Sequence, residues 1–157
     1  MKLRRADQGQ FVFQLGKREK PLLFEVLKFY PLIPASYNRW SGGQDRSDEA
    51  SHKLIEEALT EQRHANKRQL QAILEDPGRF TEYDGGWQFS MSASELEWLL
   101  QVLNDIRVGS WIMLGSLDPK EQRRVELTGK NAPYLWAMEL CGHFETVLLQ
   151  ALSGQET

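Results

Sequence analysis

The stretch LQVLNDIRVGSWIMLG, residues 100–115, decides the fold, because it predicts the most apolar helix of the chain. Its polar residues Asn104, Asp105 and Arg107 stand in the middle of the run. A charged group on the core-facing side of a helix costs several kcal/mol unless it is paired. We therefore expect this stretch to contain either a paired charge that fixes the packing of the helices or a binding site.

The sequence on either side of this stretch predicts further helices. Ser92 and Glu95 form a capping-box pattern at the start of the apolar helix, and Gly115 and Pro119 bracket its end. Proline and capping residues also mark the ends of the other helical segments. The other predicted helices cover residues 20–30, a long stretch from a cap at Ser47 or Asp48 to Glu75, a short stretch after Asp118, and residues 132–152.

Two short segments predict β structure. Residues 10–15, QFVFQL, alternate apolar and polar side chains, and residues 79–91 predict a hairpin around Asp84-Gly85-Gly86. We expect the fold to be mainly α: a bundle of about four helices with a small β-hairpin or three-stranded sheet element. The length of 157 residues suits one domain, with residues 1–8 and 153–157 frayed at its ends.

Composition and charge exclude several classes of protein. Hydrophobic residues make up 41% and charged residues 26%, as in ordinary globular domains, and the formal net charge of −3 argues against nucleic-acid binding. The basic residues Lys2, Arg4 and Arg5 near the start favour solubility rather than a site. Cys141 is the only cysteine, which favours a reducing compartment. Because no signal peptide or run of about 20 apolar residues occurs, we expect a cytoplasmic protein without membrane contact.

Arg107 falls in the middle of one side of the predicted helix when residues are placed at about 100° per step. Asn104 lies at the margin of that side, whereas Asp105 points almost the opposite way. On the last predicted helix, Glu145 lies outside the narrow polar stripe, among apolar residues. We therefore predict an ion pair between Arg107 and Glu145. The apolar residues that share the side of Arg107 are Leu96, Leu100, Leu103, Trp111 and Leu114.

The long second helix places three amide side chains, Gln62, Asn66 and Gln69, on its apolar side. Together with Asn104 and the predicted Arg107–Glu145 pair, they form one polar layer between the helices. We favour a hydrogen-bond network that fixes the register of the helices. The alternative is a polar pocket or groove that takes a ligand or a peptide.

No motif in the sequence argues for catalysis, a metal or a cofactor. Glu-x-x-His occurs at His52 and His64, but both motifs lie on one helix, and di-iron bundles place them on facing helices. Cys141 and His143 diverge on a helix, so they make no zinc pair. Cys141 also has apolar neighbours, which favours a packing role over a nucleophilic one.

A binding role is better supported, because the segment YPLIPASYNRW at residues 30–40 carries large apolar residues on a proline-stiffened stretch. These residues either contact a partner protein or cap the core of the bundle. Trp98 and Ile112, on the far side of the apolar helix, either cover a neighbouring element or form the seam of a homo-oligomer. The candidate contact residues in the segment are Tyr30, Leu32, Ile33, Tyr37 and Trp40.

Trp98, the run Leu103-Asn104-Asp105-Ile106-Arg107 and Gly109 resemble the W…LNDLRL-x-LG signature of a bacterial domain-of-unknown-function family best known from actinobacteria. Upstream, YPLIPASY and the helix that begins near Asp48 are similar to the P-x-x-Y…D…E first half of that family. The resemblance covers most of the chain. The chain departs from the family pattern at Val108, where Leu is usual, and in a longer loop at residues 118–131.

Genes of this family often neighbour the ClpS adaptor of the ATP-dependent Clp protease, so the resemblance implies protein turnover or another protein-interaction role. It assigns no role to any residue. We therefore expect a non-catalytic protein-interaction or regulatory module. The alternative is a small-molecule-binding or enzymatic helical bundle with a polar pocket around Arg107. A dry, fully paired Arg107 favours the first hypothesis, and a deep cavity lined by Arg107 favours the second.

Overall fold

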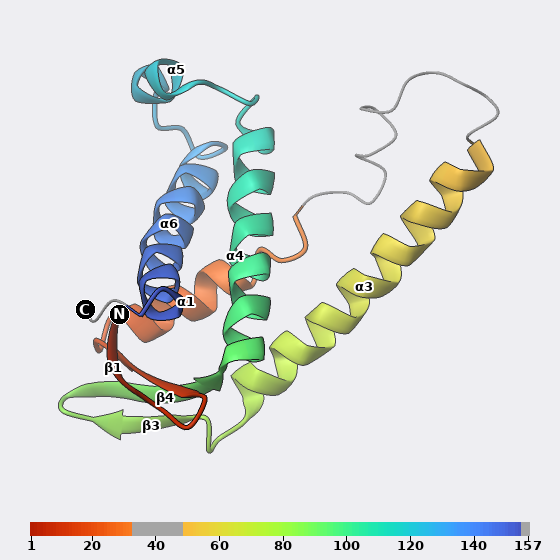
Figure 1. Cartoon of the computed structure of the whole chain (residues 1–157). Helices are drawn as coiled ribbons and strands as arrows, with labels where there is room; N and C mark the ends of the chain where they lie inside the picture. Colours follow the sequence, from red (N-terminus) through yellow and green to blue (C-terminus); the bar gives the residue numbers. More distant parts are fainter. Residues whose placement is uncertain (33–48, 155–157) are drawn as a thin grey trace.

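The computed structural model of the chain describes residues 1–32 and 49–154. Within these residues it contains five helices and one four-stranded sheet (Figure 1). The strands are β1 (Lys2–Asp7), β2 (Gln10–Leu15), β3 (Phe80–Tyr83) and β4 (Gly86–Ser92). The helices are α1 (Glu19–Leu27), α3 (Glu49–Glu75), α4 (Ala93–Met113), α5 (Pro119–Arg124) and α6 (Ala132–Leu152).

The expected fold class, a four-helix bundle with a small hairpin or three-stranded sheet, is wrong. The sheet has four antiparallel strands in the order β1-β2-β4-β3, so the fold is mixed α/β. The strand that was not expected is β1, in a segment predicted to be frayed. Most of its side chains are exposed, because it is an edge strand held by backbone pairing to β2. A mostly charged strand has no apolar alternation from which sequence reasoning can identify it.

The individual elements predicted from sequence patterns are nevertheless present. The predicted strand at residues 10–15 is β2, and it pairs with the second arm of the predicted hairpin, β4. The capping box at the start of α4 is confirmed: Glu95 N donates to Ser92 Oγ at 3.2 Å, and Ser92 N donates to Glu95 Oε1 at 3.1 Å. The predicted caps of α3, Ser47 and Asp48, lie outside the described residues.

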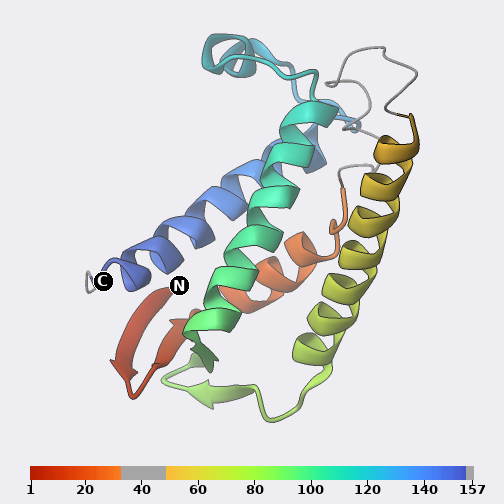
Figure 2. The ribbon, with the colours of Figure 1, turned by 45° about the vertical axis from the view of Figure 1, so that its right-hand side comes forward.

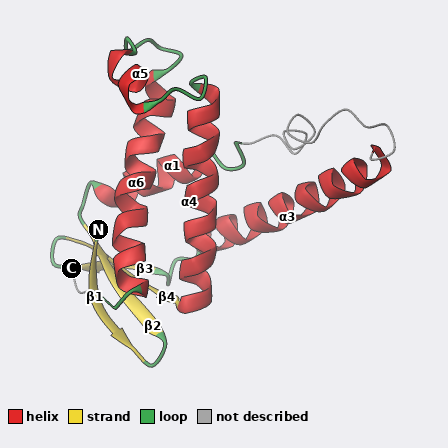
Figure 3. Ribbon diagram, turned by 45° about the horizontal axis from the view of Figure 1, so that its top comes forward, coloured by secondary structure: helices red, strands yellow, loops and turns green. Residues whose placement is uncertain are grey.

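Helices α4 and α6 run antiparallel and side by side, α1 crosses them, and the sheet lies at one end of this group (Figure 1; Figure 3). Helix α5 lies at the opposite end, in the connection between α4 and α6. In Figure 1 the long helix α3 lies closest to α4 at its C-terminal end, near the sheet, and diverges from α4 toward its N-terminal end, whereas in the view of Figure 2 the two helices look almost parallel. Helix α4 therefore faces α6 on one side and α3 on another.

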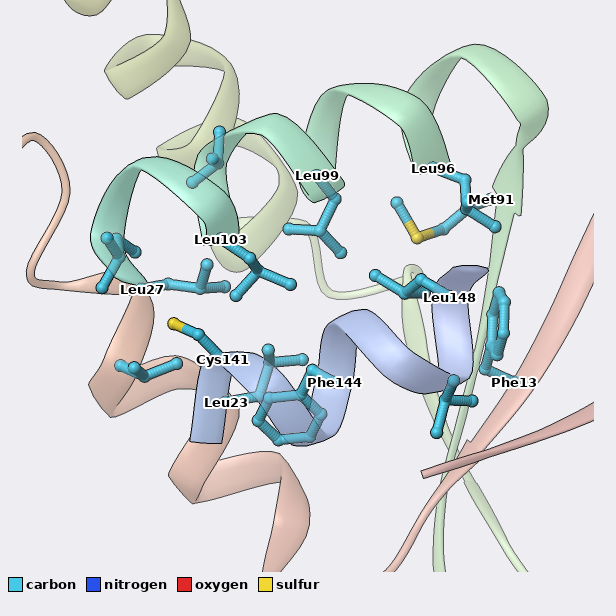
Figure 4. Close-up of a cluster of buried hydrophobic side chains, with 14 of the residues drawn as sticks. Phe13, Leu23, Leu27, Met91, Leu96, Leu99, Leu103, Cys141, Phe144 and Leu148 are labelled. Carbon is cyan, nitrogen blue, oxygen red and sulfur yellow. The ribbon is translucent and has the colours of Figure 1, made fainter. Parts of the chain in front are cut away.

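The core lies where the sheet, α1, α4 and α6 meet. The close-up in Figure 4 shows Phe13 of β2 and Met91 of β4 beside leucines of α4 and side chains of α6. Leu103 and Phe144 are at most 1% exposed. Among the described residues, α3 contributes a single fully buried side chain, Leu70, near its sheet end. The core therefore fixes α4 against α6 and leaves most of α3 outside it.

Candidate functional site

The predicted ion pair between Arg107 and Glu145 is confirmed. Arg107 Nη1 lies 3.3 Å from Glu145 Oε2 and joins α4 to α6. The Glu145 side chain is 9% exposed, whereas the Arg107 side chain is 46% exposed. The carboxylate is thus the buried partner of the ion pair, and the guanidinium extends toward solvent.

The expectation that Arg107 stands in the middle of the core-facing side of α4 is wrong. The residues that α4 buries include Leu99, Val102 and Ile106, and Arg107 lies at the edge of this stripe. Trp111, expected on the buried side, is 36% exposed, and its indole N–H donates to Leu117 O at 2.8 Å beyond the end of the helix. Trp111 therefore covers the turn after α4 rather than the core, and counting it as a core residue misplaced the predicted buried face.

Arg107 lines an open groove of about 540 Å³ between α4, α5 and α6. Arg123 of α5 lines the same groove, so two guanidinium groups from different helices border one depression. Leu135 and Met138 of α6 give the groove apolar surface, and Glu139 contributes one carboxylate. The remaining lining residues are Pro119, Gln122 and Gly142. We call this depression the Arg107 groove. Because Arg107 is paired with Glu145 and is also half-exposed, the site is neither a fully buried ion pair nor a deep cavity.

Electrostatics explains how Arg107 is held at this groove. Burial raises the pKa of the Glu145 carboxyl above its ordinary value, and the Arg107 guanidinium opposes part of the rise. Glu145 Oε1 is buried and has no hydrogen-bond partner in the described part of the chain. Burial also raises the pKa of the nearby Cys141 thiol to about 12, with a further contribution from Glu145. A thiol with that pKa is not a nucleophile near neutral pH, which agrees with a packing role.

The amide residues expected to join this pair do not do so. Gln62, Asn66 and Asn104 line a separate cleft of about 280 Å³ between α3 and α4, on another side of α4. Gln69 is exposed and does not line that cleft. The predicted single polar layer is therefore divided in two, because α3 diverges from α4 and does not reach the α4–α6 interface (Figure 1; Figure 3).

The second site, which we call the α3–α4 cleft, is built around Asn66. Trp98 Nε1 donates to Asn66 Oδ1 at 3.1 Å, and Asn66 Nδ2 donates to the Tyr30 hydroxyl at 3.0 Å. Lys67 Nζ also donates to Tyr30 O at 2.9 Å. These bonds tie the chain just after α1 to both α3 and α4. Trp98 therefore covers a neighbouring helix in this structure.

Sequence reasoning missed Asp105, which lines the α3–α4 cleft together with Arg63. Burial raises the pKa of the Asp105 carboxyl above its ordinary value, and the charge of Arg63 lowers it in part. The seven-residue spacing of Trp98, Asp105 and Ile112 was the available signal, since it places all three on one face of a helix. A tryptophan on that face indicates that another element covers it.

The predicted protein-contact segment is described only at its start. Tyr30 is 2% exposed and belongs to the core, so it is not a surface contact residue, and Leu32 is half-buried. Ile33, Tyr37 and Trp40 lie outside the described residues.

Metal-ligating side chains do not gather in the described residues: no three His, Cys, Asp or Glu side chains form a group that suits a metal ion. Cys141 and His143 diverge as expected, since Cys141 is buried and His143 Nε2 lies 3.2 Å from Glu19 Oε2 on α1. In residues 1–32 and 49–154, no helix has the length and hydropathy of a membrane span.

Comparisons with protein-family models, with curated proteins and with solved structures found no match for this chain.

Proposed function

We propose that this chain is a non-catalytic protein-interaction module that binds an acidic segment of a partner protein in the Arg107 groove. The observation that carries this proposal is the position of Arg107, which is fixed from below by Glu145 at 3.3 Å and is half-exposed at the groove. An arginine has five N–H donors in a fixed planar arrangement that matches a carboxylate. In the described part of the chain, the Glu145 contact is the one ion pair of Arg107, so other donors remain for a partner.

The rest of the groove also suits a peptide segment. Arg123 supplies a second guanidinium, and arginine and methionine are both enriched at protein interfaces. Met138 and Leu135 offer adaptable apolar surface beside the two charges. Pockets that bind small molecules usually enclose most of the ligand, whereas this groove is open to solvent. The chemistry therefore favours a segment with one or two acidic residues next to an apolar residue.

The proposed setting is a reducing compartment, the cytoplasm, which fits a single cysteine that is buried and unpaired. The resemblance to the ClpS-neighbouring family supports a partner connected with protein turnover, or a regulatory role in it. It supports no enzymatic activity.

A displayed peptide library tests the proposal. Peptides selected on the wild-type protein should be enriched in Asp and Glu next to apolar residues. Their binding should fall about tenfold or more in Arg123→Gln, because a charge-assisted hydrogen bond contributes about 1.5–3 kcal/mol. Arg124→Gln is the matched control, since Arg124 is the next residue of α5, is exposed and does not line the groove.

Arg107→Lys tests the same site without removing the charge that faces Glu145. It should weaken binding because lysine cannot make the planar two-point contact. Selected peptides without acidic residues, or an equal loss in Arg124→Gln, would contradict the proposal. If free dicarboxylic acids bound as tightly as the peptides, the alternative of a small-molecule-binding or enzymatic bundle would be favoured instead.

A further inference from the structure

The α3–α4 cleft has features of a ligand site that the proposed docking function does not use. It is polar, measures about 280 Å³ and lies on a different side of α4 from the Arg107 groove. Most of α3 lies outside the apolar core, so apolar side chains do not fill the space between α3 and α4 here. Its polar and charged lining residues include Tyr30, Arg63, Asn66, Gln101, Asn104 and Asp105.

Asp105 and Arg63 carry opposite charges in this cleft without contacting each other. The charge of Arg63 lowers the pKa of the Asp105 carboxyl and so acts on it from a distance. No ion pair joins the two side chains in the part of the chain that the structure describes. The Asp105 carboxylate, which is half-buried, also accepts no hydrogen bond there. Because its oxygens still reach solvent through the cleft, the Asp105 carboxylate is accessible to a positively charged group of a ligand.

The polar groups next to these charges are held in place. Asn66 uses its oxygen for Trp98 and one N–H for Tyr30, which leaves one amide N–H of Asn66 unused. The Tyr30 hydroxyl accepts that bond and retains its own proton as a donor. Because these side chains are already fixed, they lose little conformational freedom when a ligand binds.

We propose that the α3–α4 cleft binds a free α-amino acid, with its ammonium group at Asp105 and its carboxylate at Arg63. A ligand with one charge would leave either Asp105 or Arg63 without a partner, whereas a zwitterion satisfies both. The volume of about 280 Å³ lies just below the usual range of about 300–1,000 Å³ for ligand pockets, which fits a molecule of this size. The amides of Gln101 and Asn104, which line the same cleft, favour an amino acid with a polar side chain.

The binding experiment titrates each of the twenty amino acids separately into the full-length protein and follows the heat of binding. At least one amino acid with a polar side chain should bind with a one-to-one stoichiometry. Its N-acetyl derivative lacks the ammonium group and its amide derivative lacks the carboxylate. Each derivative should bind at least about tenfold more weakly, because each loses a charge-assisted hydrogen bond.

Variants assign the binding to the cleft. Asp105→Asn and Arg63→Gln should each weaken the wild-type ligand at least about tenfold. The matched controls are Glu97→Gln on α4 and Arg68→Gln on α3, since both residues are exposed and neither lines the cleft. If a cleft variant did not fold, the two derivatives would still test the same contacts on the wild-type protein.

Three results would overturn the inference: no amino acid binds, the derivatives bind as well as the parent amino acid, or the control variants lose as much affinity as the cleft variants. The outcome is independent of the docking proposal, because Arg123→Gln changes the Arg107 groove and leaves the α3–α4 cleft intact.

Discussion

Replacing Arg107 by methionine tests whether Glu145 is a buried charge that depends on its partner. The substitution keeps most of the side-chain volume and leaves a carboxylate that is 9% exposed without its counter-ion. Breaking a buried pair on one side costs about 3–5 kcal/mol, whereas an exposed pair contributes at most about 1 kcal/mol. Because the Arg107 side chain is 46% exposed, we expect an intermediate loss of about 2 kcal/mol in the free energy of unfolding near neutral pH.

This loss should depend on pH in a defined direction. The pKa of Glu145 is raised above its ordinary value of 4.5 by burial, and Arg107 opposes part of the rise. A raised pKa means that the stability contributed by Glu145 is complete below the unfolded value and is lost as pH rises through the folded value. Arg107→Met removes the opposing charge, so the variant should lose more stability than the wild type as pH rises from about 4 to about 7.

Urea unfolding followed by tryptophan fluorescence measures both quantities, since the chain has 5 tryptophans. The control is the double variant Arg107→Met with Glu145→Gln, which removes both charges and should unfold within about 1 kcal/mol of the wild type. The account is refuted if Arg107→Met is as stable as the wild type near neutral pH. It is also refuted if its loss of stability is the same at both pH values.

Three other substitutions test separate parts of the account by urea unfolding. Ser92→Ala removes the capping box of α4 and should lower the free energy of unfolding by about 1 kcal/mol. Gly86→Ala should lower the free energy of unfolding by about 2 kcal/mol or more, because the new Cβ would lie 2.3 Å from Leu15 O. Its control is Gly129→Ala, whose new Cβ meets open space and should change the free energy of unfolding by less than about 0.5 kcal/mol. Asp105→Asn should be at least as stable as the wild type at neutral pH, because the raised pKa of Asp105 makes its ionisation unfavourable in the folded state. The variant should lose this advantage toward about pH 4, where the wild-type carboxyl becomes protonated. A variant that is less stable than the wild type at neutral pH would contradict this.

The Arg107–Glu145 pair could be predicted from the sequence because each charge stands off the polar face of its own helix. Two inward charges of opposite sign on helices that are expected to pack leave few alternatives. The pattern predicted which two residues pair, but it did not predict that the Arg107 side chain is half-exposed. That exposure depends on α5, whose placement over the ends of α4 and α6 no local pattern encodes.

Asp105 could not be assigned by the same reasoning, since a helical wheel divides a helix into one buried and one exposed face. Helix α4 faces α6 on one side and the middle of α3 on another, so a residue opposite one helix lies beside the other. The strand β1 escaped prediction for a different reason. Its residues pair through the backbone at the edge of the sheet, and backbone pairing does not require a side-chain pattern.

The most direct test of the proposed docking function is to map a bound acidic peptide on the protein by NMR. A peptide from the library selection is titrated into the labelled wild-type chain, and the shifts of the backbone amides are followed. The account predicts shifts at Arg107, Arg123 and Gly142, which line the Arg107 groove, and none at Asn66 in the α3–α4 cleft. Shifts centred on Asn66, or no shifts at the three groove residues, would contradict it.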